Sequence, residues 1–251
     1  MSQARNSLVR PLTARSVIAS TLLGITPPRL SAAALVASGE QYGVAAGTTR
    51  VALSRMVEAS ELVAVDASYE LAGPLLDRHA RQEQGRHPRT KPWKGDWRIA
   101  VVRAGPRTAR ARADLRAAMA RLRMAELREG VWVRPDNVAS FTNDECVWIT
   151  GTLDDDVDVD ALFATHAWAA VARELLSELA ATAPRLRARD ADALADTFML
   201  AAATTRHLTL DPLLPHQLLP KDWPGDELRR AYDDYQTDFA ATWRQWFRSL
   251  D

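Results

Sequence analysis

The stretch GTTRVALSRMVEASELVAVDASYEL, residues 47–71, changes from the periodicity of a helix to that of a hairpin. Its apolar residues at helical spacing share one predicted face, formed by Ala52, Leu53, Met56 and Val57. The opposite face would carry Thr48, Val51, Ser54, Arg55 and Glu58, with Arg50 on its flank. The LVAVDASYEL that follows predicts two short strands joined by a tight turn at residues 66–68.

Two more helices are predicted upstream of this stretch. In LTARSVIASTLLG, Thr13 can cap the start of the helix and Gly24 ends it. Pro27 and Pro28 then stop the helical pattern, and Ser31 can cap a second helix over SAAALVASGEQYG. Three helices followed by a small hairpin are typical of a winged helix-turn-helix, so residues 1–78 are predicted to form a DNA-binding domain of this kind.

In such a domain the second helix of the helix-turn-helix pair enters the major groove, and here that helix starts near Thr48. Arginines can contact guanine or phosphate, and short hydroxyl side chains can donate to phosphates or base edges. The predicted DNA contacts are therefore Thr48, Thr49, Arg50, Ser54, Arg55 and, on the hairpin, Ser68. The alternative is that the two arginines are only surface charges on a small core helix.

The middle of the chain has a different pattern. Residues 79–96, HARQEQGRHPRTKPWKGD, are polar, basic and interrupted by prolines, which favours a linker. Strands are predicted for WRIAVVRA, GVWVRP and ECVWITGTL, with a helix over RTARARADLRAAMARLRM. This order predicts a ferredoxin-like domain at residues 97–160, and the helical patterns that follow predict a helical C-terminal domain at residues 161–251. The chain is thus expected to be an α+β protein of three parts.

The formal net charge of zero hides an uneven distribution. Residues 86–134 carry 14 basic and 4 acidic side chains, whereas residues 135–251 carry 10 basic and 21 acidic ones. A basic middle indicates contact with polyanions or pairing with the acidic half of the chain. Its arginine-rich helix could contact flanking DNA, hold an anionic ligand such as the phosphates of a coenzyme A thioester, or pair with the C-terminal half. The candidate ligand-binding residues are Arg107, Arg110, Arg112 and Arg116.

Motifs of several enzyme classes are missing from the sequence. It contains no GxxxxGK[ST], GxGxxG, GxSxG or HExxH, and its only cysteine, Cys146, leaves no CxxC site. A metal or acid–base site using His207, Asp211 and His216 is one alternative. A nucleic-acid-processing role of the basic middle is another, with Asp96 as its only nearby acidic candidate. We expect a cytoplasmic protein that is no enzyme, uses no cofactor and has no membrane span.

Residues 211–225 read DPLLPHQLLPKDWPG and cannot form a regular helix, because prolines lack an N–H donor and fix φ. The leucines and the tryptophan predict an apolar segment that packs against the helices of the C-terminal domain as scaffold. The spacing of Pro212 and Pro215 also permits a PxxP-ligand interpretation, although the segment is expected to face inward.

Three segments resemble the PaaX family of bacterial transcriptional regulators. They are LTARSVIASTLLG with TRVALSRMVEASEL, the tryptophan-containing KPWKGDWRIAVV, and RHLTLDPLLPHQLLPKDWPGDELRRAY. The last is the most specific, and its signature residues are Asp211, Pro212, Pro215, Leu218, Leu219, Pro220, Trp223, Pro224 and Gly225.

The resemblance implies a transcriptional regulator, usually a repressor, that binds double-stranded operator DNA as a homodimer and responds to an aromatic acyl-CoA such as phenylacetyl-CoA. It also implies a winged helix, a ferredoxin-like (Cas2-like) central domain and a helical C-terminal domain. No short motif of the family marks its ligand residues.

Overall fold

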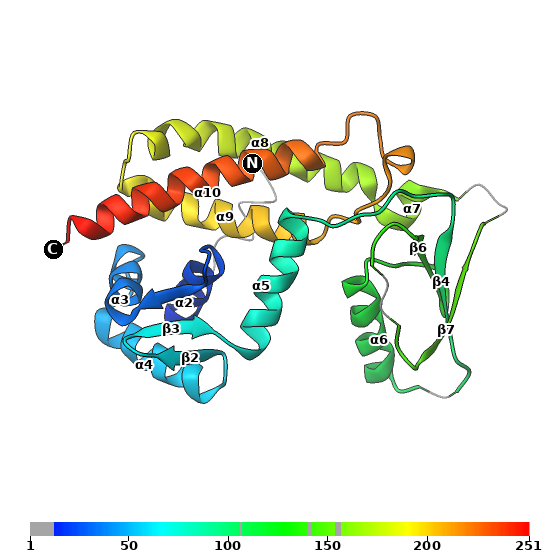
Figure 1. The fold of residues 1–251 in the computed structure, drawn as a ribbon, viewed down its shortest axis with the longest axis horizontal. Coiled ribbons are helices and arrows are strands. Elements are labelled where there is room, and N and C mark those ends of the chain that lie inside the picture. The colour runs from blue at the N-terminus through cyan, green and yellow to red at the C-terminus, as the bar shows by residue number, and fades with distance from the viewer. Residues whose placement is uncertain (1–12, 106, 140–141, 154–156, 251) are drawn as a thin grey trace. The chain divides into compact units, whose positions relative to one another are not determined.

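The computed structural model describes residues 13–105, 107–139, 142–153 and 157–250 (Figure 1). The contacts of the chain divide it into two compact units. The first unit contains residues 1–86, 172–209 and 226–251, and the second contains residues 87–171 and 210–225.

The N-terminal part of the first unit alternates helices and short strands. Its elements are α2 (Ala14–Leu23), β1 (Arg29–Ser31), α3 (Ala32–Gln41), α4 (Ala46–Glu58), β2 (Leu62–Val65) and β3 (Ser68–Leu71). Thr13 caps α2 and Ser31 caps α3, as predicted. The strands form an antiparallel sheet in the order β1-β3-β2, and the helices bury Ile18, Leu22, Leu35, Leu53 and Met56 in one core.

The predicted hairpin is confirmed. Val65 pairs with Ser68, and Asp66 turns the chain with a φ of 53°. The three-residue strand β1 was not predicted, because so short a segment after two prolines carries no period of its own.

The linker prediction is wrong for residues 79–86, which belong to helix α5 (Gly73–Arg86). This helix buries Leu75, Gln82 and Gly85. A side chain on Gly85 would place its Cβ 2.8 Å from the backbone oxygen of Leu208, so the glycine allows α5 to lie close against α9 (Asp192–Thr209). The sequence of α5 resembles a linker because it is polar and contains a glycine. In the structure, Gln82 and Gly85 are buried where the helix packs.

Two long helices complete the first unit, together with residues 172–187 of α8 (Thr165–Arg187). These are α9 and α10 (Gly225–Arg248), which run alongside one another in Figure 1. The Tyr235 hydroxyl donates to the Thr197 carbonyl at 2.7 Å, and Thr242 Oγ1 donates to the Leu186 carbonyl at 2.8 Å. These buried hydrogen bonds fix the register of α10 on its neighbours.

The second unit contains an antiparallel sheet in the order β5-β6-β4-β7. Its elements are β4 (Trp97–Val102), α6 (Ala109–Arg121), β5 (Ala125–Arg128), β6 (Val131–Pro135) and β7 (Cys146–Gly151). One core joins α6 to the sheet through Leu115, Met119, Ala100 and Trp132. This strand order with a helix between β4 and β5 is that of a ferredoxin-like sheet, so the predicted central fold is found. Its strand β5 was not among the predicted strands.

By its contacts, the signature segment, residues 210–225, groups with the second unit. Asn137 Nδ2 donates to the Leu213 carbonyl at 2.8 Å, and Arg123 donates to the Asp211 carbonyl. Trp223 stacks on Trp168, which follows the short helix α7 (Val159–Phe163), with ring centroids 4.4 Å apart.

Within this segment, the Asp211 carboxylate accepts a hydrogen bond from the Leu213 N–H at 2.7 Å, and Leu213 has a φ of 52°. This turn leads into the short 3₁₀ helix η1 (His216–Leu218). Pro212 and Pro215 are buried, which argues against the PxxP-ligand interpretation. These contacts anchor the segment beside residues of the central sheet, and its role as scaffold stays a prediction.

Candidate nucleic-acid interface

Helix α4 presents one exposed polar face. Leu53 and Met56 are buried in the core, while Thr48, Arg50, Ser54 and Arg55 are exposed, as their spacing predicts. Arg50 and Arg55 form no ion pair with any residue that the structure describes. Two unpaired guanidinium groups on one helix can therefore contact phosphates or guanine edges without first breaking a salt bridge.

Thr49 has to be removed from the predicted DNA contacts, because its side chain is 0% exposed. It lies against α3, where a Cβ on Gly39 would be 2.3 Å from Thr49 Oγ1. Thr49 is four and seven residues from Leu53 and Met56, so it belongs to their buried stripe. Its hydroxyl faces back to the Ala45 carbonyl at 3.4 Å. The role of Thr49 is to let α3 and α4 pack closely.

The hairpin tip carries little net positive charge. The guanidinium of Arg29 is 3.3 Å from the Asp66 carboxylate and 3.2 Å from that of Glu70. Ser68 is half-buried in β3, the central strand, where it is paired with both Ser31 and Val65. The contribution of Ser68 to DNA binding stays a prediction. The charge of the hairpin tip contributes little to phosphate binding, because Arg29 is paired with two carboxylates.

An ion pair connects α2 to the start of the hairpin. Arg15 Nε donates to Glu61 Oε2 at 2.8 Å. The hydrogen bond from Arg15 holds the pKa of the Glu61 carboxyl below its usual value. This pair fixes the helical part of the N-terminal region to the hairpin at one edge.

The arginine-rich helix α6 borders a hollow of about 170 Å³ in the second unit, lined by Arg107, Arg112 and Arg116 together with Glu126 and Glu129. Arg110 does not line this hollow.

These arginines pair with acids of the same unit. Arg107 lies 3.8 Å from Glu145, Arg116 lies 3.6 Å from Glu126, and Arg110 lies 3.9 Å from Asp114. Arg112 forms no ion pair within the described part of the chain and is the arginine most available to an anion.

The proposed metal or acid–base trio gains no support. His207 lies near the end of α9, and Asp211 and His216 lie in the segment that follows this helix. Asp211 is buried and its carboxylate holds the turn at Leu213, while His216 is exposed. Among the described residues there is no group of three or more His, Cys, Asp or Glu side chains that could hold a metal ion. Asp96, the acidic candidate for nucleic-acid processing, therefore belongs to no such group among the described residues.

Comparison with known proteins bears on both units. Residues 90–154 match the PaaX protein central Cas2-like domain, and residues 158–249 match the PaaX-like protein C-terminal domain. The chain belongs to the PaaX-like family. Membership of this family indicates a transcriptional regulator that binds DNA.

A solved structure gives a similar result for almost the whole chain. The uncharacterized protein Rv0674 from Mycobacterium tuberculosis is 38% identical, with a TM-score of 0.74, and the match covers 93% of this PaaX-like chain and 98% of that one. No protein with a curated description matches significantly. In the described part of the PaaX-like chain, no helix is both long and apolar enough to cross a membrane.

Proposed function

We propose that this protein is a transcriptional repressor whose winged helix-turn-helix, residues 13–71, binds operator DNA through α4. The observation that carries the proposal is the exposed, unpaired pair Arg50 and Arg55 on a helix whose other face is anchored in the core. The order α2-β1-α3-α4-β2-β3 supports it, because this is the order of elements in a winged helix, with α4 as the recognition helix.

The start of α4 adds a second contact for the DNA backbone. Ala45 precedes the helix and offers no side-chain cap, so the first-turn N–H groups have no side-chain acceptor. Thr48 is exposed in the same turn. N–H groups at a helix start bind phosphate oxygens, so DNA contact at this end would position Arg50 and Arg55 over the groove.

The proposal includes a homodimer that contacts two half-sites. Two recognition helices must lie about 34–36 Å apart to meet successive turns of one face of B-DNA. An effector that prefers a dimer with another spacing lowers operator affinity by shifting the population of dimers. Size-exclusion chromatography with light scattering tests the dimer, and a monomer at micromolar concentration would contradict it.

By resemblance, the proposed effector is an aromatic acyl-CoA such as phenylacetyl-CoA, with its phosphates near Arg107, Arg110, Arg112 and Arg116. The other three arginines form ion pairs, so Arg112 is the one most available to the effector and the residue to test. Calorimetric titration of phenylacetyl-CoA into the protein and into Arg112→Ala should show weaker binding by the variant. Equal affinity would remove α6 from the effector site while leaving the DNA-binding proposal intact.

The DNA-binding proposal is tested by fluorescence anisotropy with a duplex from the region upstream of the protein's own gene. We expect Arg50→Ala and Arg55→Ala each to weaken binding roughly tenfold, since each removes a contact worth about 1–3 kcal/mol. The matched control is Arg230→Ala, which removes an exposed arginine from α10 and should leave affinity unchanged. Wild-type affinity in both α4 variants would contradict the assignment.

A further inference from the structure

Val51 is an exposed apolar residue in the middle of the polar face of α4. Its exposed fraction is 52%, whereas Leu53 and Met56 on the opposite side of the helix are each 2% exposed. Thr48 lies three residues before Val51 and Arg55 four residues after it, so these side chains form one row along the helix. A single exposed valine is ordinary on a protein surface, but this one lies at the centre of the face that is proposed to bind DNA.

Small residues one turn away on either side leave the Val51 side chain prominent. Gly47 lies four residues before it, and a Cβ on this glycine would meet nothing within 4 Å. Ser54 lies three residues after it, and its hydroxyl donates to the Arg50 carbonyl at 3.3 Å, so this side chain folds back on the helix. A valine in a helix has one strongly preferred χ1 rotamer. Val51 therefore presents two methyl groups in a fixed direction to a partner on this face.

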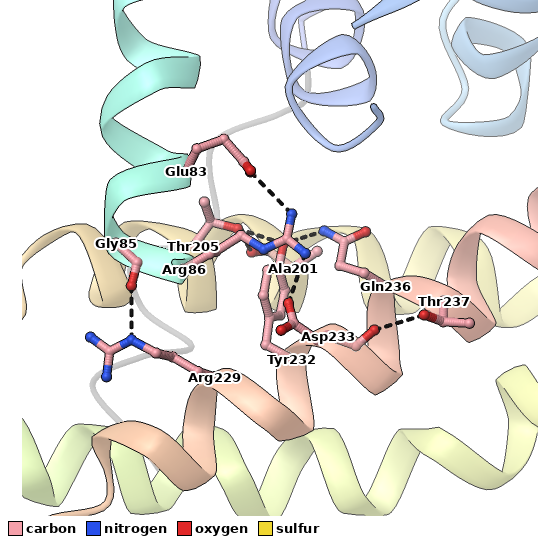
Figure 2. Close-up of polar contacts among 10 residues, drawn as sticks. All are labelled: Glu83, Gly85, Arg86, Ala201, Thr205, Arg229, Tyr232, Asp233, Gln236 and Thr237. Atoms are coloured by element: carbon pink, nitrogen blue, oxygen red, sulfur yellow. Dashed lines mark hydrogen bonds and ion pairs between the residues drawn. The ribbon is translucent and has the colours of Figure 1, made fainter. Parts of the chain in front are cut away.

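The polar contacts that hold the first unit together do not use this face of α4. Trp243 of α10 donates through Nε1 to Ser38 Oγ of α3 at 3.3 Å. Arg86 of α5, the helix that follows the hairpin, is 2.7 Å from Asp233 of α10 (Figure 2). Among the residues that the structure describes, the side chains of α4 form hydrogen bonds only with their own helix and the residue before it. The outer face of α4 is therefore available to a partner.

Thymine gives the major groove of DNA an apolar group that a valine can contact. The base edges in this groove present hydrogen-bond donors and acceptors, and thymine adds its C5-methyl group. The side chain of Val51 forms no hydrogen bonds, so it can distinguish base pairs there only through this methyl. One turn of helix advances about 5.4 Å and successive base pairs lie about 3.4 Å apart, so Val51 and Arg55 would contact positions within about two base pairs of each other.

We propose that Val51 determines part of the operator sequence by packing on the C5-methyl group of a thymine in each half-site, beside the base or phosphate that Arg55 contacts. This inference rests on the proposed function, because it assigns a sequence preference to the proposed recognition helix. Contacts to phosphates position a protein on DNA but carry no sequence information. Val51 therefore adds a specificity that phosphate contacts of the two exposed arginines do not supply.

Replacing thymine by deoxyuridine tests this contact, because it removes the C5-methyl group and leaves base pairing unchanged. Fluorescence anisotropy is measured with the duplex from upstream of the protein's own gene, and the thymines of its two half-sites are replaced one pair at a time. We expect one pair of replacements to weaken binding by the wild type roughly tenfold. Each half-site then loses a methyl contact worth roughly fourfold in affinity.

A variant of the valine identifies which residue contacts the methyl group. Val51→Ala should weaken binding to the unmodified duplex roughly tenfold, and the decisive pair of deoxyuridines should then cause little further loss. The matched control is Val171→Ala, which changes a valine of α8 that is 41% exposed and should alter neither result. Alanine is a better helix former than valine, so neither variant is expected to destabilise the fold, and thermal melting checks this.

The salt dependence of binding separates this apolar contact from the charged ones. Val51 neutralises no phosphate, so Val51→Ala should leave the slope of log Kd against log salt as it is in the wild type. A shallower slope in Val51→Ala would show that the substitution disturbs the phosphate contacts of α4, and would contradict a direct contact between Val51 and the base.

Three results would overturn the assignment of Val51 while leaving the DNA-binding proposal intact. They are wild-type affinity in Val51→Ala, wild-type binding that no deoxyuridine pair weakens, and a deoxyuridine effect that is as large in Val51→Ala as in the wild type. In the last case another residue would contact the methyl group. Failure of the wild type to bind the duplex at all would instead contradict the proposed function, and the inference about Val51 would fall with it.

Discussion

Single residues decide how closely α3 and α4 approach. A Cβ on Gly39 would be 2.3 Å from Thr49 Oγ1, whereas one on Gly47, near the start of α4, would meet nothing within 4 Å. We therefore expect Gly39→Ala to destabilise the protein by about 1–3 kcal/mol through overpacking. Gly47→Ala should instead stabilise it by about 0.5–1 kcal/mol, the usual gain in a helix. Chemical denaturation of both variants checks this, and equal stabilities would contradict the close contact.

Because Arg15 and Glu61 form an ion pair, we expect the stability of the fold to depend on pH. The pKa of Glu61 is lowered in the folded state, so the pair stabilises the fold above the ordinary Glu pKa of about 4.3 and loses this effect as pH falls through the folded-state pKa. Glu61→Gln should lower the melting temperature at pH 7, and the difference from the wild type should shrink in acid. Glu58→Gln, which changes an exposed acid of α4, serves as the control. A difference independent of pH would exclude the ion pair as its cause.

At the scale of elements, a buried polar network holds the signature segment. Arg134 is 4% exposed and donates to Asn137 Oδ1 at 3.0 Å, and Asn137 donates in turn to the Leu213 carbonyl. Asn137→Ala removes the partner of Arg134 Nη2 and of the Leu213 carbonyl, so it should cost about 1–3 kcal/mol. Residues 210–225 should also become more open to limited proteolysis. Asn143→Ala, in the loop before β7, leaves this network intact and serves as the control. Unchanged cleavage of the segment in Asn137→Ala would contradict the anchoring role.

The sequence predicts those elements whose signals are local. The capping residues Thr13 and Ser31 indicate the starts of α2 and α3, and the turn at Asp66 indicates the hairpin. These elements are predictable because caps and turns depend on neighbouring residues. The sequence does not predict helix α5, since Gly85 is explained only by the nearby backbone of Leu208. The spacing of Thr49 to Leu53 indicates a buried position, whereas its polar hydroxyl favours an exposed one. The spacing is the correct signal, because Thr49 is buried. No sequence pattern indicates the cavity of about 260 Å³ in the first unit, because its lining comes from five separate segments of the chain.

In the molecule as a whole, the N-terminal region belongs to the same contact unit as helices that are distant in the sequence, and the central sheet belongs to another unit. Residues 172–209 and 226–251 return to the N-terminal region, while residues 210–225 return to the sheet. The three consecutive parts stay a prediction from sequence order, and each contact unit combines segments that are distant in the sequence.

The central claim is that Arg50 and Arg55 of α4 contact DNA. Its most direct test is the salt dependence of operator affinity, measured by anisotropy for the wild type, each single variant and the double variant. If each arginine neutralises a phosphate, the slope of log Kd against log salt should become shallower by about 0.9 for each one removed. Weaker binding with an unchanged slope would assign them to bases instead. Unchanged affinity and an unchanged slope in the double variant would contradict the proposed DNA contacts of Arg50 and Arg55.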